Sequence, residues 1–168
     1  MSEKLIGLAP VISDQPRVLI LGSMPSKQSL EKQEYYGNPR NHFWKIMMNI
    51  LEHDTPILNY EDKLALIKHH HIALWDTINA CYREGSLDAD IIAEEPNDLD
   101  QLIKDFPSIR LIACNGTKSF QTFNKYFEKE NFLNVDVIKL PSSSPVPGRY
   151  NKTLDGKIAD WQQITTYL

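Results

Sequence analysis

The chain contains little cysteine: only Cys81 and Cys114 occur among its 168 residues. Neither lies in a Cys-x-x-Cys pair or at the spacing of zinc ligands, so the sequence excludes a disulfide framework and argues against a structural zinc site. A run of three histidines covers residues 69–71. No carboxylate or cysteine stands at ligand spacing from this run, and a solvated helix end explains it better. We therefore expect no metal and no cofactor.

The chain also lacks a long apolar run and an excess of basic residues. No segment is long and apolar enough to span a bilayer, and no basic N-terminus leads into an apolar stretch with a small-residue cleavage site. We therefore expect a cytoplasmic protein that makes no membrane contact. The net charge is −4, so the composition does not indicate nucleic-acid binding, which usually shows as a basic face. It does not exclude an enzyme that contacts DNA transiently through a few cationic side chains.

The length of 168 residues is that of one domain, and such a chain buries roughly two-thirds of the surface that its unfolded form exposes. We expect residues 1–168 to form a single domain. Residues 1–16 contain prolines and several apolar side chains, which predict an arm packed over the core. The sequence does not determine the oligomeric state, and a monomer is the simplest expectation.

Three short apolar runs predict buried strands, at residues 18–21, 72–75 and 109–114, and residues 135–140 predict a fourth strand. Continuous aliphatic runs of this length are typical of a parallel sheet covered by helices. Helical patterns fall between and after them, at residues 41–52, 60–70, 98–106, 120–127 and 154–167. Residues 77–92 lack clear periodicity and predict a loop with a short helical turn. The alternation predicts a three-layer α/β/α sandwich around a central four-stranded parallel sheet.

Loops rich in glycine, proline and polar residues follow three of these strands. They read GSMPS at residues 22–26, NGTKS at residues 115–119 and LPSSSPVPG at residues 140–148. Ligands of open α/β sheets bind beyond the carboxyl ends of the strands, so these loops are candidate walls of a site. Residues 35–44, YYGNPRNHFW, add aromatic rings, amides and a guanidinium, the groups that stack on an unpaired base and bond its edge. Phe43 and Trp44 fit the core face of the following helix better.

In this order, the three loops and the segment at residues 35–44 resemble the uracil-DNA glycosylase superfamily, and most closely its deoxyinosine (hypoxanthine) DNA glycosylase branch. The resemblance covers about the whole chain, including residues 74–91. The superfamily's first motif, Gly-x-(Asp or Asn)-Pro, reads Gly-Ser-Met-Pro here, so Met24 replaces the water-activating residue. A thioether neither orients nor deprotonates water. Leu140 replaces the His or Asn that precedes Pro-Ser in the second motif, and both departures are the forms expected of the deoxyinosine branch.

The resemblance implies a reaction and a set of site residues. The reaction is hydrolysis of the N-glycosidic bond of a deaminated base, most of all hypoxanthine, after the nucleotide flips out of DNA. The implied catalytic residues are Asn41, which orients the attacking water, and Asn115, which bonds the base. Tyr36 is implied to stack on the base. Ser23 and Met24 are expected to complete the base-binding site.

The partner expected from this reaction is DNA that contains a deaminated base. The side chains expected to contact its phosphates are Ser142, Ser143, Ser144, Lys118 and Arg149. An inert turn is the alternative for the serine-rich loop, and His42 is either a phosphate contact or a surface residue. Asp76 and Asp88 are a possible carboxylate pair, although helix capping and loop hydrogen bonds explain each more simply.

Other functions stay open at this point. One is a mismatch-type glycosylase for uracil or xanthine, and another is a non-catalytic relative that binds nucleic acid. A third is an unrelated α/β enzyme for a small phosphorylated substrate, which ranks last because no glycine-rich phosphate fingerprint occurs. No lysine is placed as a Schiff-base nucleophile, so simple hydrolysis is expected. The range of bases and the opposing base cannot be read from the sequence.

Overall fold

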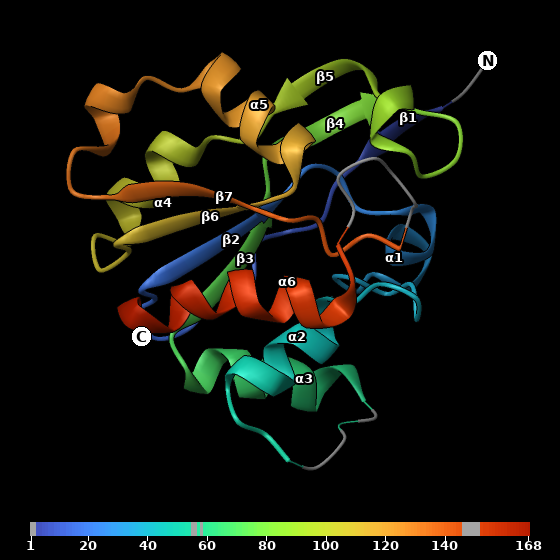
Figure 1. Ribbon diagram of the computed structural model, residues 1–168. Coiled ribbons are helices and arrows are strands. Elements are labelled where there is room, and N and C mark those ends of the chain that lie inside the picture. Colours follow the sequence, from blue (N-terminus) through green and yellow to red (C-terminus); the bar gives the residue numbers. More distant parts are fainter. Residues whose placement is uncertain (1–2, 55–56, 58, 146–151) are drawn as a thin grey trace.

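A parallel sheet forms the centre of the molecule in the computed structural model, which describes residues 3–54, 57, 59–145 and 152–168 (Figure 1). The sheet has four strands in the order β3-β2-β6-β7. They are β2 (Val18–Gly22), β3 (Ile72–Asp76), β6 (Leu111–Asn115) and β7 (Asp136–Leu140). Val18 on β2 is paired with both Ile72 and Leu111. The four strands predicted from the sequence are confirmed.

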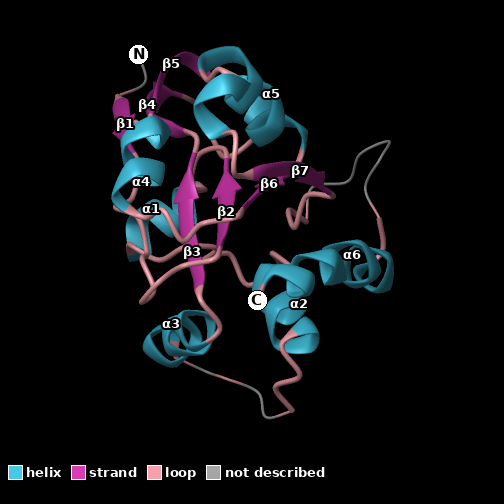
Figure 2. Ribbon diagram, turned by 90° about the vertical axis from the view of Figure 1, so that its left-hand side faces the viewer, coloured by secondary structure: helices cyan, strands magenta, loops and turns pink. Residues whose placement is uncertain are grey.

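Helices cover both faces of this sheet because successive strand residues point to opposite sides. On β2, Val18 and Ile20 pack with α2 (Phe43–Ile50), α3 (Tyr60–His69) and α6 (Leu154–Trp161). Leu19 and Leu21 pack with α4 (Leu99–Asp105) and α5 (Thr117–Tyr126). Figures 1 and 2 show the first group of helices below the sheet and α5 above it. The predicted three-layer α/β/α architecture is therefore confirmed.

A second, smaller sheet lies at one end of the molecule, towards the upper right of Figure 1. It is antiparallel, in the order β1-β4-β5, and consists of β1 (Lys4–Ile6), β4 (Ile78–Tyr82) and β5 (Ile92–Pro96). The prediction that residues 77–92 form a loop is wrong, because β4 lies there. The predicted short helical turn does occur, as the 3-10 turn η1 (Asp88–Asp90). The β4–β5 pair has two register shifts, and such bulges break the alternation by which a strand is recognised.

Three further short elements complete the described part of the chain. Helix α1 (Lys27–Lys32) follows the loop after β2, and the C-terminal helix changes after Trp161 into the 3-10 segment η3 (Gln162–Tyr167). Another 3-10 segment, η2 (Lys129–Phe132), precedes β7. Trp161 is fully buried, and its indole N–H donates to the carbonyl oxygen of Pro141 at 2.9 Å. This bond fixes the start of the serine-rich loop to α6.

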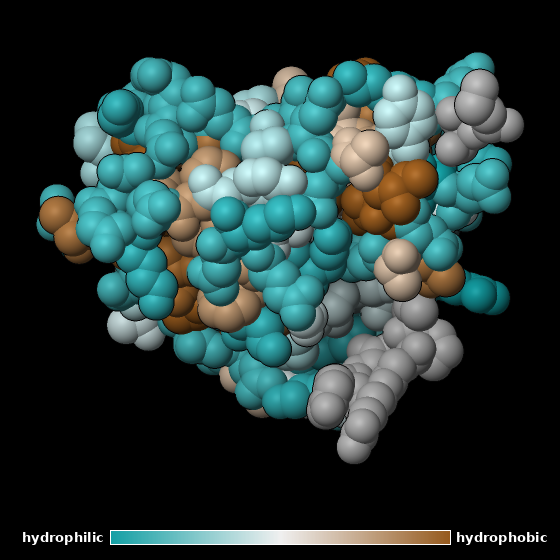
Figure 3. All heavy atoms as spheres, turned by 90° about the horizontal axis from the view of Figure 1, so that it is seen from above, coloured by the Kyte–Doolittle hydropathy of each residue, from teal (hydrophilic) through white to brown (hydrophobic). Residues whose placement is uncertain are grey.

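The surface seen from above is mostly polar, with hydrophobic side chains gathered in small patches (Figure 3). In the part of the chain that the structure describes, the large hydrophobic residues that are clearly exposed are Ile6, Leu87, Ile92 and Leu133. Among the same residues, no helix combines the length and the apolar character needed to cross a membrane.

Candidate active site

A cavity of about 420 Å³ lies at the carboxyl ends of the central strands. Its walls come from the loop after β2, the segment before α2, the ends of β3 and β6, the η1 region and the serine-rich loop. The lining residues are 22–26, 29, 35, 36, 38, 41, 76, 86–89, 115 and 142–144. The cavity thus brings together eight of the ten residues that the sequence proposed as a site.

The loop after β2 is held between the two sheets. The N–H groups of Thr77 and Ile78 donate to the carbonyl oxygens of Gly22 and Ser23 at 2.9 and 3.0 Å. Met24 is only 6% exposed and packs with Ile78 in a small apolar cluster while also lining the cavity. Met24 therefore anchors the loop as well as shaping the cavity wall.

Gly22 stands where β2 approaches a carboxyl group most closely. A Cβ atom on Gly22 would lie 2.3 Å from the Oδ1 atom of Asp76 and 3.4 Å from the hydroxyl oxygen of Tyr36. Real Cβ atoms do not approach an oxygen this closely, so only glycine leaves room for both side chains. The glycine of the first motif therefore has a packing role inside the cavity.

The ring of Tyr36 forms one wall of the cavity and stacks on Phe43, with ring centroids 3.9 Å apart and planes inclined by 19°. Phe43 and Trp44 are buried, at 0% and 7% exposure, which confirms their prediction as core residues. Only the opposite face of Tyr36 is available for stacking on a ligand. Burial, with the charge of Asp76 adding to it, raises the pKa of the Tyr36 phenol above its ordinary value. Its hydroxyl therefore stays protonated and can donate a hydrogen bond.

Asn115 ties the serine-rich loop to Tyr36. Its side-chain nitrogen donates to the hydroxyl oxygens of Tyr36 and Ser143 at 3.2 and 2.9 Å, and its Oδ1 atom accepts from the Ser143 N–H at 2.9 Å. Ser143 is 1% exposed, and its carbonyl oxygen accepts from the His42 N–H at 2.9 Å. Ser143 thus braces the loop from inside, whereas the sequence suggested a phosphate contact.

Gly116, directly after Asn115, is the second glycine that the site requires. Its φ of +94° is in the left-handed region, and a Cβ there would lie 3.0 Å from the Cβ of Ser142. We expect Gly116→Ala to lower the free energy of unfolding by about 1–3 kcal/mol, because backbone strain and crowding add. Urea unfolding measures this change. Gly85→Ala is the matched control, because Gly85 has a φ of +77° but open space around it; an equal loss in both variants would show that contact with Ser142 is unimportant.

Asn41 lies at the cavity wall just before α2. Its Oδ1 atom accepts from the Phe43 N–H at 2.9 Å, and its own N–H donates to the Asn38 carbonyl oxygen at 2.9 Å. These bonds fix the side chain in place. The carbonyl oxygen of an amide has two lone pairs, so Asn41 retains one acceptor position for a further group.

His42 and Lys157 form a support behind the serine-rich loop that the sequence analysis missed. The Nζ atom of Lys157 is 3.1 Å from the His42 Nδ1 atom and donates to the Ser144 carbonyl oxygen at 3.2 Å, and Lys157 is fully buried. Burial, followed by the charges of Lys157 and Lys45, lowers the pKa of His42, so the neutral imidazole accepts from the ammonium. The sequence feature that indicated this contact was the position of Lys157 one helical turn before Trp161, since both residues lie on the buried side of α6.

Asp76 and Asp88 both line the cavity but differ in their partners. Asp88 accepts from the Ser23 hydroxyl at 2.6 Å, as the simple loop interpretation expects. Asp76 is 4% exposed, and its Oδ2 atom is buried without a hydrogen-bond partner among the described residues. Burial, with the charge of Asp88 adding to it, raises the pKa of Asp76 to about 7, while Arg83 opposes the rise. Helix capping does not explain Asp76. In the sequence, its position at the end of a buried strand was the feature that indicated a place in the site.

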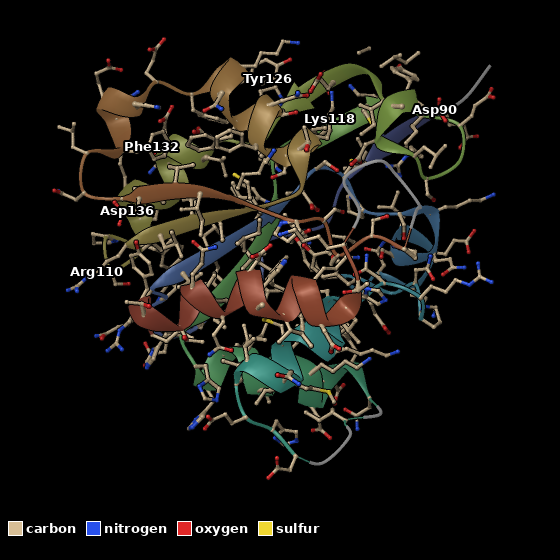
Figure 4. The ribbon with its side chains drawn as sticks, in the orientation of Figure 1. Asp90, Arg110, Lys118, Tyr126, Phe132 and Asp136 are labelled. Atoms are coloured by element: carbon tan, nitrogen blue, oxygen red, sulfur yellow. The ribbon has the colours of Figure 1, made fainter. Side chains whose placement is uncertain are left out.

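One of the proposed phosphate contacts, Lys118, is not part of the cavity wall. Lys118 lies on α5 (Figure 4), where its Nζ atom forms an ion pair with Glu94 at 3.2 Å. Arg149 lies outside the described residues. Within the described ranges, no group of three or more His, Cys, Asp or Glu side chains has an arrangement that could hold a metal ion.

These features define an α/β protein with an amide-lined and hydroxyl-lined cavity at the strand ends. Residues 9–165 match the family described as the uracil DNA glycosylase superfamily. The chain is 37% identical over 158 residues to a protein of Methanosarcina acetivorans named hypoxanthine DNA glycosylase, covering 94% of this chain and 96% of that one. A protein of Methanosarcina barkeri with the same name is 40% identical over 113 residues, which are 67% of this chain and 72% of that one.

A solved structure supports the same assignment. The solution NMR structure of a candidate uracil DNA glycosylase from Methanosarcina acetivorans superposes with a TM-score of 0.81 at 35% identity, and 97% of each chain is covered. This chain belongs to the uracil DNA glycosylase superfamily. The resemblance inferred from the motifs is thereby confirmed.

Proposed function

We propose that this protein is a DNA-deoxyinosine glycosylase, which hydrolyses the N-glycosidic bond of deoxyinosine in DNA and releases hypoxanthine. The observation that carries the proposal is the meeting of Tyr36, Asn41 and Asn115 in one cavity of a uracil DNA glycosylase superfamily member. Two relatives that bear the name hypoxanthine DNA glycosylase support the choice of base. We also propose that it acts as a cytoplasmic monomer and that its partner is DNA containing the deaminated base.

The cavity suits one extruded base. Its volume of about 420 Å³ falls in the range of small-molecule sites, roughly 300–1,000 Å³. A base in it would stack on the free face of Tyr36, as extruded bases stack on aromatic side chains. A deaminated pair opens more readily than a matched one, so extrusion itself favours the damaged nucleotide.

Asn115 prepares the hydroxyl groups that would bond the base. Both N–H groups of its amide have acceptors, the hydroxyl oxygens of Tyr36 and Ser143. Since each hydroxyl then accepts from Asn115, its own proton is left to donate elsewhere. Hydrogen bonds in such a chain strengthen one another. We therefore propose that Asn115 acts on the base through the Tyr36 hydroxyl, and that direct donation from its amide would require exchange of one existing partner.

Asn41 would position the attacking water with the second lone pair of its carbonyl oxygen. An amide is not a strong base, so the rate must come from orientation of the water and from stabilisation of the leaving base. The proposed phosphate contacts are Ser142 and Ser144 at the cavity and Arg149. For Lys118, contact with a phosphate would require exchange of its partner Glu94.

The test is a cleavage assay with the purified protein in excess over a duplex that carries one deoxyinosine opposite thymidine. Alkali then breaks the strand wherever a base has been removed. We expect one break, at the inosine, and none in a matched duplex with deoxyadenosine at that position. Absence of the break would reject the proposal. Parallel duplexes with uracil or xanthine identify the alternative glycosylases, and binding without a break would identify a non-catalytic relative.

A further inference from the structure

Asp76 is a buried carboxyl group that no structural role explains. It ends β3, is 4% exposed and lines the cavity, and its Oδ2 atom has no hydrogen-bond partner among the described residues. Gly22 leaves the space that this carboxyl occupies, since a Cβ would lie 2.3 Å from its Oδ1 atom. Burying a polar group without a partner costs free energy, so such groups are kept where they act on a ligand.

The surroundings of Asp76 favour its neutral form. The ionisable groups that interact with it are the Tyr35 and Tyr36 phenols before α2, Asp88 in η1 and Arg83 after β4. Arg83 is the only cation among them, and its Nη2 and Nε atoms donate to the carbonyl oxygens of Pro25 and Gly85. No ion pair to Asp76 occurs in the described part of the chain. A carboxyl group in such an environment keeps its proton near neutral pH and can donate it.

We propose that Asp76 is the catalytic acid of the reaction and transfers its carboxyl proton to the N7 atom of the departing hypoxanthine. This inference rests on the proposed function, because it assigns a role to a residue in that same cavity. It adds a proton donor to a site in which Met24 has replaced the usual Asp or Asn. The Tyr36 hydroxyl, 3.4 Å from the same Gly22 Cβ position that Asp76 crowds, would bond the base beside it.

The step balances without a further reactant. The C1′–N9 bond breaks, and its electron pair stays with the purine. The proton of Asp76 moves to N7, so the base leaves as neutral hypoxanthine. Water forms the new C1′–O bond, and the proton that it loses returns to the Asp76 carboxylate. The net change is addition of water across the glycosidic bond, and the acid is regenerated.

The pH dependence of single-turnover excision distinguishes an acid from a base at this position. Burial raises the pKa of Asp76 to about 7, so an acid loses activity as the pH rises through this value. We expect the wild-type rate constant to be level from pH 6 to about 7 and to fall above it. A rate that rises through the same range would make Asp76 a water-activating base and overturn the proposal, as would a rate independent of pH. His42, with its lowered pKa, would affect only the acidic side of the profile.

Two variants and one substrate analogue test whether the falling limb of the pH profile, the decrease in rate above about pH 7, comes from Asp76. Asp76→Asn keeps the shape of the side chain but has no proton to transfer, and we expect it to be at least tenfold slower at pH 6 with no falling limb. Asp88→Asn still accepts from Ser23 but removes a negative charge, so the limb should move to lower pH. A duplex with 7-deaza-deoxyinosine lacks the proton acceptor, and wild type and Asp76→Asn should then react equally slowly. A falling limb that survives in Asp76→Asn would contradict the inference.

Thermal unfolding separates failure of this inference from failure of the proposed function. A carboxyl group whose folded-state pKa is raised contributes stability that is present below its unfolded pKa and is lost as the pH rises from that value through about 7. The melting temperature of wild type should therefore fall relative to that of Asp76→Asn between about pH 4.5 and 7.5, and the difference should stay constant above that range. If wild type released no hypoxanthine at any pH, the proposed function would fail. If it released hypoxanthine but the two melting profiles ran parallel, only the role of Asp76 would fail.

Discussion

Replacing Asn41 by alanine is expected to slow release of hypoxanthine from deoxyinosine DNA by about 100-fold or more. Its Oδ1 atom is fixed by the Phe43 N–H and retains one lone pair at the cavity wall. In the proposed mechanism this acceptor orients the attacking water, and an alanine side chain has no atom that can do so. Single-turnover excision at pH 6 measures the loss directly, and a fluorescence titration with the same duplex shows whether binding is retained.

The substitution also removes the hydrogen bond that the Asn41 side chain accepts from the first N–H of α2, which requires a control of similar structural cost. Asn59 provides one, because its side chain accepts from the Asp62 N–H at 2.8 Å and caps α3. Loss of such a cap costs about 1 kcal/mol of stability. We expect Asn59→Ala to have a comparable effect on unfolding and none on excision. If both variants lost activity to the same extent, the role of Asn41 would be structural.

The second large effect is expected from Gly22→Ala. The added methyl group would lie 2.3 Å from the Asp76 Oδ1 atom, so the buried carboxyl would have to shift from its position in the cavity wall. Overpacking of this kind costs about 1–3 kcal/mol of stability. Because the displaced groups form the cavity wall, we expect excision to fall by at least about 100-fold, which corresponds to roughly 3 kcal/mol in the activation free energy.

A double substitution shows whether the contact with Asp76 is responsible. Asp76→Gly removes the crowded carboxyl, so combining it with Gly22→Ala should recover stability without recovering activity. Gly156→Ala in the first turn of α6 serves as the matched control, because alanine is the better helix former and no atom lies closer than 3.3 Å to its Cβ. Equal destabilisation in the single and double variants would show that the strain lies elsewhere.

The central sheet was predictable because its signal is local. Strands β2, β3 and β6 are nearly continuous apolar runs, which are typical of strands buried on both faces, whereas β7 at the sheet edge mixes apolar and exposed polar residues. Strands β4 and β5 were missed for two reasons. Their pairing contains two register shifts, and all residues of β5 are exposed except Glu94, which is partly buried. Its partner strand lies on the other side of the η1 loop. No local pattern records such a pairing.

The candidate site was predictable in its position but not in its internal contacts. Loops that follow parallel strands must meet at one edge of the sheet, which predicted the position of the site. The choice of Tyr36, Asn41 and Asn115 within it came from the resemblance to the glycosylase superfamily. The ion pair between Lys118 and Glu94 could not be predicted, because Glu94 lies on β5, a strand that the sequence did not indicate. The lack of a partner for the Asp76 Oδ2 atom and the contacts of Lys157 with His42 and Ser144 depend on the three-dimensional surroundings of these residues. A single sequence does not indicate either.

The bond between Trp161 and the Pro141 carbonyl has a consequence for how the protein acquires its activity. The cavity walls include the exits of all four central strands, from β2 to β7, and α6 is bonded to the last of them. Contacts this distant in sequence form late, because closing long stretches of chain is entropically unfavourable. During refolding, helical circular dichroism should therefore recover first. Excision of the base should return only when the C-terminal helix docks, so recovery of enzymatic activity reports the rate of the final folding step.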